Sequence, residues 1–136
     1  MRGRFTFFGT GASMGIPVIG CECSVCLSDS PLNKRMRSAA LLQVVDTNIL
    51  VDVGPDFRSQ ALGHRLTHLD ALILTHTHYD HVAGLDDLRI FAFKNKKPLP
   101  VLVSKETMED LRKTHCYLVE GNTSPKFAFH ILEKDL

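Results

Sequence analysis

The segment ILTHTHYDH, from Ile73 to His81, places three of the chain's seven histidines and one aspartate within six positions. Alternate side chains of an extended segment share a face, so His76 and His78 can point the same way from a strand end. Two imidazoles about 7 Å apart along the backbone can converge on one cation. Asp80 and His81 follow where the chain begins to turn and can reach a neighbouring position. One strand end could therefore hold two adjacent metals.

The donor types of this cluster narrow the choice of metal. Imidazole with carboxylate suits Zn²⁺, Mn²⁺ or iron, whereas Mg²⁺ prefers oxygen ligands alone. We expect Zn²⁺, with Mn²⁺ as the alternative. A histidine-rich surface loop is the competing interpretation, and for any single histidine it is the simpler one. Three histidines and an aspartate directly after an apolar run favour the metal site.

A second cluster, Cys21, Cys23 and Cys26, has the spacing C-x-C-x-x-C. Three thiolates at this spacing can hold one tetrahedral Zn²⁺ at about 2.3 Å each, with a fourth ligand from elsewhere. In a reducing compartment such thiols serve as ligands rather than forming disulfides. The alternative is three small buried residues, because free cysteine packs as a hydrophobe. Structural zinc would order the polar loop at residues 20–37.

Strands and helices predicted from apolar periodicity place these clusters. Strands are expected at 4–8, at 69–76 and in the run 39–54, where residues 46–48 form a hairpin turn, and later at 99–104 and 126–132. Helices are expected at 55–63, 84–95 and 104–115. The strand at 69–76 delivers the histidines at its C-terminal end. Strand and helix alternation predicts an α/β layered sheet with functional loops at one edge.

The composition describes one ordinary soluble domain. The chain has 136 residues, of which 44% are hydrophobic and 23% charged. A net charge of +1 gives no broad electrostatic attraction for nucleic acid or an anionic membrane. No stretch approaches the roughly 18 apolar residues of a membrane span, and the first apolar run is shorter than that of a secretory signal. We therefore expect a cytoplasmic protein.

THTHYDH matches the H-x-H-x-D-H motif of the metallo-β-lactamase superfamily, which the chain resembles. The resemblance implies an αββα sandwich with a dinuclear metal site at one edge, His76 and His78 binding the first metal and Asp80 and His81 the second. VDVG looks like the family's second strand, which implies that Asp52 orients a ligating histidine by a hydrogen bond. The alternative at Asp52 is a strand-end aspartate that caps a turn.

GTGASMGIPVIGCECSVC, followed by THTHYDHVAGLDDLR, resembles the PhnP-type branch of that superfamily. Members of this branch are phosphodiesterases that act on cyclic phosphate esters of ribose and carry a structural zinc on the cysteine loop. The resemblance implies two active-site Zn²⁺, with Mn²⁺ as the alternative, one structural Zn²⁺, and a small phosphodiester as substrate. Ribonuclease Z, which trims transfer RNA precursors, shares the early G-T-G and the histidine motif but typically not the cysteine loop. An RNA-processing nuclease is therefore the alternative function.

The family's complete site takes further ligands from later strands, beyond what this chain of 136 residues supplies. Five residues remain as substitutes, each with a straightforward structural interpretation, and His130 is the nearest to a ligand role: His64, His68, His115, Cys116 and His130. No catalytic group beyond the metal ligands is identified. We expect residues 1–136 to be the N-terminal half of a longer hydrolase, with an uncovered sheet face that favours homodimerisation. A metal-binding half-domain without turnover is the third functional hypothesis.

Overall fold

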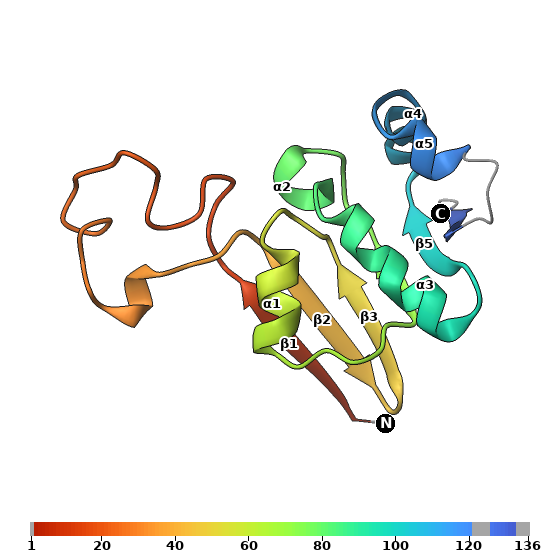
Figure 1. Cartoon of the computed structure of the whole chain (residues 1–136), viewed down its shortest axis with the longest axis horizontal. Coiled ribbons are helices and arrows are strands. Elements are labelled where there is room, and N and C mark those ends of the chain that lie inside the picture. Colours follow the sequence, from red (N-terminus) through yellow and green to blue (C-terminus); the bar gives the residue numbers. More distant parts are fainter. Residues whose placement is uncertain (1, 121–125, 133–136) are drawn as a thin grey trace.

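The computed structural model describes residues 2–120 and 126–132. These residues form a six-stranded sheet whose strands lie side by side in chain order (Figure 1). The strands are β1 (Gly3–Gly9), β2 (Ala39–Val44), β3 (Thr47–Val51), β4 (Ala71–Ile73), β5 (Leu99–Val103) and β6 (Phe127–Ile131). β1, β2 and β3 pair antiparallel, and β3 to β6 pair parallel. The predicted α/β sheet is confirmed.

Helices provide the crossovers that parallel strand pairs require. They are α1 (Phe57–Gly63), α2 (Tyr79–Val82), the 3₁₀ helix η2 (Leu85–Leu88), α3 (Arg89–Asn95), α4 (Lys105–Thr114) and α5 (Cys116–Val119). A further 3₁₀ turn, η1 (Pro31–Asn33), lies in the cysteine loop. None of the helices in the described ranges has the length and apolar character needed to cross a membrane.

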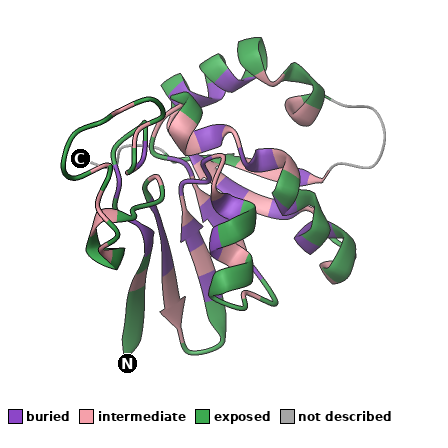
Figure 2. Ribbon diagram, turned by 60° about the vertical axis from the view of Figure 1, so that its left-hand side comes forward, coloured by how far each residue is buried: buried purple, intermediate pink, exposed green. Residues whose placement is uncertain are grey.

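One face of the sheet carries the hydrophobic core. Leu41, Leu50, Leu72 and Val101 occupy one register row across β2 to β5, and none is more than 4% exposed. Helical side chains, among them Phe57 of α1, belong to the same buried cluster. Figure 2 shows the buried segments concentrated between the strands and the helices. Truncating such a leucine to alanine typically lowers the free energy of unfolding by 2–5 kcal/mol. This layer therefore holds the sheet in place, including the edge that carries the histidine motif, which we call the metal edge.

The opposite face of the sheet is apolar but much less buried. Phe5 is 52% exposed and Phe7 is 64% exposed, with their rings 5.2 Å apart. We call this face the open face. Its half-buried apolar strand residues include Leu42, Ile49, Val51, Ile73 and Leu102. An apolar sheet face of this extent marks an interaction surface.

We propose that the isolated chain self-associates through the open face. Light scattering coupled to size exclusion should report a dimer or larger species for the wild type, and the double variant F5K/F7K should run as a monomer. Leu62 of α1 is 63% exposed on the helical side of the sheet, so L62K is the matched control and should behave like the wild type. A monomeric wild type would count against both self-association and the half-domain hypothesis.

Several predicted boundaries differ from the structure. The turn expected at residues 46–48 falls at 45 and 46, because Thr47, the first residue of β3, already pairs with Val44. The strand expected at 69–76 is assigned only to Ala71–Ile73, because the Thr75 N–H donates to the Asp52 side chain instead of a neighbouring strand. The helix expected from residue 55 begins at Phe57, and the Asp56 carboxylate binds Arg37 rather than capping that helix. The N-cap of α4 is Ser104, whose Oγ accepts from Thr107 N–H at 3.1 Å.

Candidate metal centre

The ends of β3 and β4 bring Asp52 and the histidine motif together. The two strands run parallel, with Val51 beside Ile73, so their C-terminal ends lie at the same edge of the sheet. Asp52 N–H donates to Ile73 C=O at 2.9 Å, which continues the pairing by one residue. The sequence motif therefore starts at a strand end, as its apolar prefix predicts.

Asp52 is 5% exposed and its carboxylate makes three contacts at this edge. Oδ1 accepts from Thr75 N–H at 2.9 Å, and Oδ2 accepts from the Thr75 hydroxyl at 2.8 Å. Its backbone has φ of +60°, a left-handed conformation that Asp and Asn tolerate better than most residues. Both interpretations of Asp52 from the sequence thus have a counterpart, because the side chain closes the turn after β4 and also faces the motif.

The third contact of Asp52 fixes His81. His81 Nδ1 lies 2.8 Å from Asp52 Oδ2, and His81 Nε2 lies 3.3 Å from Asp80 Oδ2. An ionised carboxylate only accepts, so the proton belongs on Nδ1 and Nε2 carries the lone pair. That arrangement is how a metal-ligating histidine is usually oriented. Nε2 of His81 and the Asp80 carboxylate are therefore two neighbouring lone-pair groups to which one metal ion could bind.

His76 lies against His81, and His78 lies against His76. Among the described residues, no three of the motif's ligand atoms come within 4.8 Å of one another, as those of the three cysteines do. The ring centroids of His76 and His81 are 4.0 Å apart, and those of His76 and His78 are 4.6 Å apart. His76 Nδ1 lies 2.9 Å from Thr75 Oγ1. The Thr75 hydroxyl donates its single proton to Asp52, so it can only accept a hydrogen bond from His76. His76 Nδ1 is therefore the hydrogen-bond donor in this contact. Nε2 of His76 therefore also carries the lone pair that a metal needs.

Gly54 is a residue of this site that the sequence interpretation missed. A Cβ atom at Gly54 would lie 2.1 Å from the Asp80 C=O oxygen, so no other residue fits there. The close approach holds α2 against the end of β3, with Val53 N–H donating to His81 C=O at 2.8 Å. Asp80 and His81 are both in α2, so Gly54 helps to set their position. The only signal in the sequence is a glycine directly after Val-Asp-Val.

The five substitute ligands lie in other surroundings. His64 stacks on Phe8 with centroids 4.3 Å apart, and His68 hydrogen-bonds Asn48. His130 sits opposite Leu102 in the register of the open face. Across the described ranges, no hydrogen bond, ion pair or ring contact joins the motif to any of the five: His64, His68, His115, Cys116 and His130. Among the described residues, the side chains of His76 and His81 thus contact Asp52, Thr75, His78 and Asp80.

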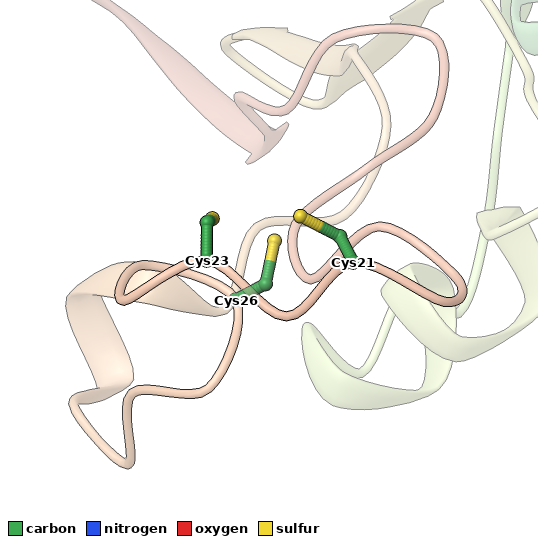
Figure 3. A group of neighbouring side chains, drawn as sticks. All are labelled: Cys21, Cys23 and Cys26. Atoms are coloured by element: carbon green, nitrogen blue, oxygen red, sulfur yellow. The ribbon is translucent and has the colours of Figure 1, made fainter.

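The three cysteines meet in the loop between β1 and β2, which extends to one side of the sheet in Figure 1. The Sγ atoms of Cys21, Cys23 and Cys26 all lie within 4.8 Å of one another (Figure 3). Val18 N–H donates to Cys26 Sγ at 3.4 Å. Within the part of the chain that is described, no fourth histidine, cysteine or acid joins them. Three converging sulfur donors fit Zn²⁺ with one position left for another ligand.

The surroundings of Cys23 and Cys26 shift the pKa values of these two thiols in opposite directions. A hydrogen bond from the Cys26 backbone, followed by contacts with the Cys21 and Cys26 side chains, lowers the pKa of Cys23 to about 7. At Cys26 the Val18 N–H also acts to lower the pKa, but contact with the Cys21 side chain and desolvation outweigh it and raise the pKa. Cys23 therefore becomes a thiolate at a lower pH than Cys26 does.

We predict that iodoacetamide alkylates Cys23 ahead of Cys26 in the metal-free chain, with the Cys23 rate half-maximal near pH 7. Zn²⁺ should protect all three clustered thiols, because metal binding competes with alkylation. Cys116 lies outside the cluster and serves as the internal control, so it should react with or without Zn²⁺. Peptide mass spectrometry gives the alkylation rate at each cysteine. If Zn²⁺ protected the three clustered thiols no better than Cys116, the zinc loop would be ruled out.

Asp56 fixes the end of the cysteine loop beside the metal edge. Its two carboxylate oxygens accept from Arg37 N–H and from Arg37 Nη1, each at 2.8 Å. Arg37 Nε in turn donates to Ser13 C=O at 2.9 Å. One ion pair therefore ties the start of α1 to both ends of the loop.

The chain belongs to the family described as the β-lactamase superfamily domain, whose profile matches residues 47–135. A curated relative from Porphyromonas gingivalis, named octanoyltransferase, is 40% identical over 124 residues, which are 90% of this chain and 25% of the relative. A probable metallo-hydrolase from Bacillus subtilis, YhfI, is 30% identical over 107 residues, covering 74% of this chain and 42% of the relative. The predicted superfamily is confirmed.

Solved structures place the chain near the predicted branch. A diphosphatase from the PhnP family superimposes with a TM-score of 0.89 at 34% identity, over 98% of this chain and 51% of that one. Zn²⁺-bound PqqB from Methylobacterium extorquens gives a TM-score of 0.77 at 22% identity, over 98% of this chain and 47% of that one. At this identity the similarity supports a shared fold and nothing more. The chain thus spans about half the length of these structures.

Proposed function

We propose that this chain supplies the metal edge of a hydrolase that cleaves small phosphate esters, cyclic phosphodiesters among them. The proposal rests on a series of side-chain contacts. Asp52 contacts His81 Nδ1, and His81 Nε2 contacts Asp80. The His76 ring packs on His81, and the His78 ring packs on His76. The 34% identical diphosphatase of the PhnP family supports phosphoryl chemistry as the reaction class.

In this proposal His76 and His78 hold one ion and Asp80 and His81 the other. Imidazole and carboxylate donors fit Zn²⁺, with Mn²⁺ as the alternative. Bound ions would supply Lewis acidity toward phosphoryl oxygens and lower the pKa of a water molecule. The protein's own contribution is orientation: Asp52 fixes the His81 ring, and Thr75 fixes His76.

No protein nucleophile is part of the proposal. Cys23, whose pKa is lowered, contacts Cys21 and Cys26 rather than a histidine, so it lacks the adjacent base of a Cys–His nucleophile. We assign Cys21, Cys23 and Cys26 to a structural Zn²⁺. Four free cysteines suit a reducing compartment, so we place the protein in the cytoplasm.

The remaining ligands and the proton donor would come from polypeptide outside residues 1–136. Two donors for each metal are fewer than a catalytic zinc site normally uses, and the chain spans about half of the similar solved structures. Residues 1–136 alone would then bind metal without turnover. The longer product of the same reading frame, where it continues, would carry the activity.

An RNA-processing nuclease is the second candidate. Human tRNase Z, short form, superimposes with a TM-score of 0.61 at 23% identity, which supports the shared fold alone. The cysteine loop and the net charge of +1 favour a small substrate over a folded RNA. The octanoyltransferase name belongs to a relative of which this chain covers a quarter, so we do not extend it to this chain.

A substrate panel separates these candidates. The 136-residue chain and its longer product are assayed with Zn²⁺ or Mn²⁺ on a cyclic ribose phosphodiester, an aryl phosphodiester, inorganic diphosphate and a transfer RNA precursor. We expect turnover of the small phosphate compounds by the longer product and none of the precursor. Cleavage of the precursor alone would select the nuclease, and turnover of none of the four by the longer product would reject both.

A further inference from the structure

A pocket of about 250 Å³ lies at the end of the sheet opposite the metal edge. Its floor is made by alternate residues of β1, Arg4, Thr6 and Phe8, together with neighbours on β2 and β3. Residues 64–68, which leave the end of α1, form its wall. Asn48 on the floor precedes Asp52 by four residues, or about 13 Å along the strand. The pocket is thus separate from the candidate metal centre.

Hydrogen bonds among its own polar groups fix the floor of this pocket. Gln43 Nε2 donates to Asn48 Oδ1 at 3.0 Å. Asn48 Nδ2 donates to His68 C=O at 3.1 Å and lies 2.9 Å from His68 Nε2. Asn48 is 5% exposed, so these bonds hold a buried side chain in one orientation. The floor is therefore preorganised rather than a set of loose surface groups.

The charged side chains of the pocket all have the same sign. Arg4 and Arg65 line it, and no aspartate or glutamate does. Throughout the described ranges, neither guanidinium has a hydrogen bond or ion pair with the protein. The nearby Asp70 carboxylate is engaged, since it accepts from Asn48 N–H at 2.8 Å and lies 4.0 Å from His68 Nε2. Two unpaired arginines therefore line the pocket without a protein counter-charge.

Backbone geometry keeps Arg65 at this position. Its φ is +53°, and its N–H donates to Leu62 C=O at 3.1 Å, which turns the chain at the end of α1. The neighbouring His64 ring stacks on Phe8, with an interplanar angle of 14°. The wall carrying Arg65 is thus attached to the strand that carries Arg4. Thr6 and Thr67 also line the pocket, and their hydroxyl groups can donate hydrogen bonds to a ligand.

We propose that this pocket binds the phosphate group of a small molecule. Guanidinium groups bind phosphate oxygens in a bidentate geometry, and such charge-assisted bonds are stronger than neutral ones. The volume suits one phosphate or diphosphate group and lies below the usual range for burying a larger ligand. The site is independent of the proposed hydrolysis, because it uses none of the residues of the metal edge.

Two-dimensional amide NMR on the chelator-treated chain tests this site without interference from bound metal. Inorganic phosphate, diphosphate and glycerol 3-phosphate are titrated separately, so that free anions and a phosphate ester are compared. We expect saturable shifts at the amides of residues 43, 48 and 64–68 for at least one of the three. Shifts confined to the histidine motif, or shifts that do not saturate, would overturn the proposal.

Paired variants separate a built site from general charge. R4Q/R65Q should raise the dissociation constant at least tenfold. R4K/R65K should give an intermediate loss of affinity, because lysine keeps the charge without the bidentate geometry. R58Q/K97Q removes two exposed cations elsewhere and should bind like the wild type. Equal weakening by R4Q/R65Q and R58Q/K97Q, or no weakening by R4Q/R65Q, would show that no specific site exists.

Discussion

In the longer product, replacing Asp80 with alanine is expected to remove metal binding at the histidine motif and phosphodiester hydrolysis together. Asp80 Oδ2 lies 3.3 Å from His81 Nε2, so the substitution deletes one of these two neighbouring lone-pair groups. Loss of a residue that merely orients a ligand costs 10–100-fold in metal affinity or activity. Loss of the ligand itself should exceed about 100-fold in turnover. The measurements are zinc content per chain and the initial rate on an aryl phosphodiester.

D87A is the matched control for D80A. Asp87 is exposed and lies seven residues away, in η2. D87A should retain metal content and rate, and both variants should keep the unfolding midpoint of the wild type within a few degrees. A D80A protein that still holds its zinc and hydrolyses the ester normally would remove Asp80 from the site.

Substitution of Asp52 is expected to have the largest effect on stability. D52A would remove the buried acceptor shared by the Thr75 N–H, the Thr75 hydroxyl and His81 Nδ1, of which His81 is the half-buried one. Unpaired buried donors cost about 1–3 kcal/mol each, and alanine is also disfavoured at φ of +60°. We expect D52A to lower the free energy of unfolding by about 3 kcal/mol. Urea denaturation followed by circular dichroism gives the value.

D52N distinguishes the stabilising role of Asp52 from its role in orienting His81. Asparagine keeps the shape, tolerates the left-handed backbone and can still accept one of the hydrogen bonds. We expect a smaller stability loss of about 1 kcal/mol together with zinc binding at the motif weakened 10–100-fold. If D52N bound zinc like the wild type, the contact between Asp52 and His81 would be structural only.

Local sequence patterns predicted the parts of the site that depend on few residues. The apolar run before the motif predicted a strand end, and the structure places His76, His78 and His81 together there. The spacing of the cysteines likewise predicted their convergence. Both predictions rest on neighbours within a few positions, for which strand and turn geometry determine what can meet. Their roles as metal ligands stay predictions.

Features that depend on distant segments could not be read from the sequence. The need for glycine at Gly54 arises from its approach to Asp80, 26 positions later. The phosphate pocket joins Arg4 to Arg65 through the pairing of β1 with β2 and the return of the chain after α1. The length of β4 was overestimated because Asp52, on a different strand, takes the Thr75 N–H.

The measurement that bears most directly on the central claim is metal content and turnover in the same preparation, for the longer product of the reading frame and its H78A/D80A variant. We predict three zinc ions in the longer product. In the variant we predict that the cysteine-bound ion remains and that the two others are lost together with phosphodiester turnover. Turnover that persists in the variant, or a variant that keeps all the zinc of the longer product, would contradict this claim.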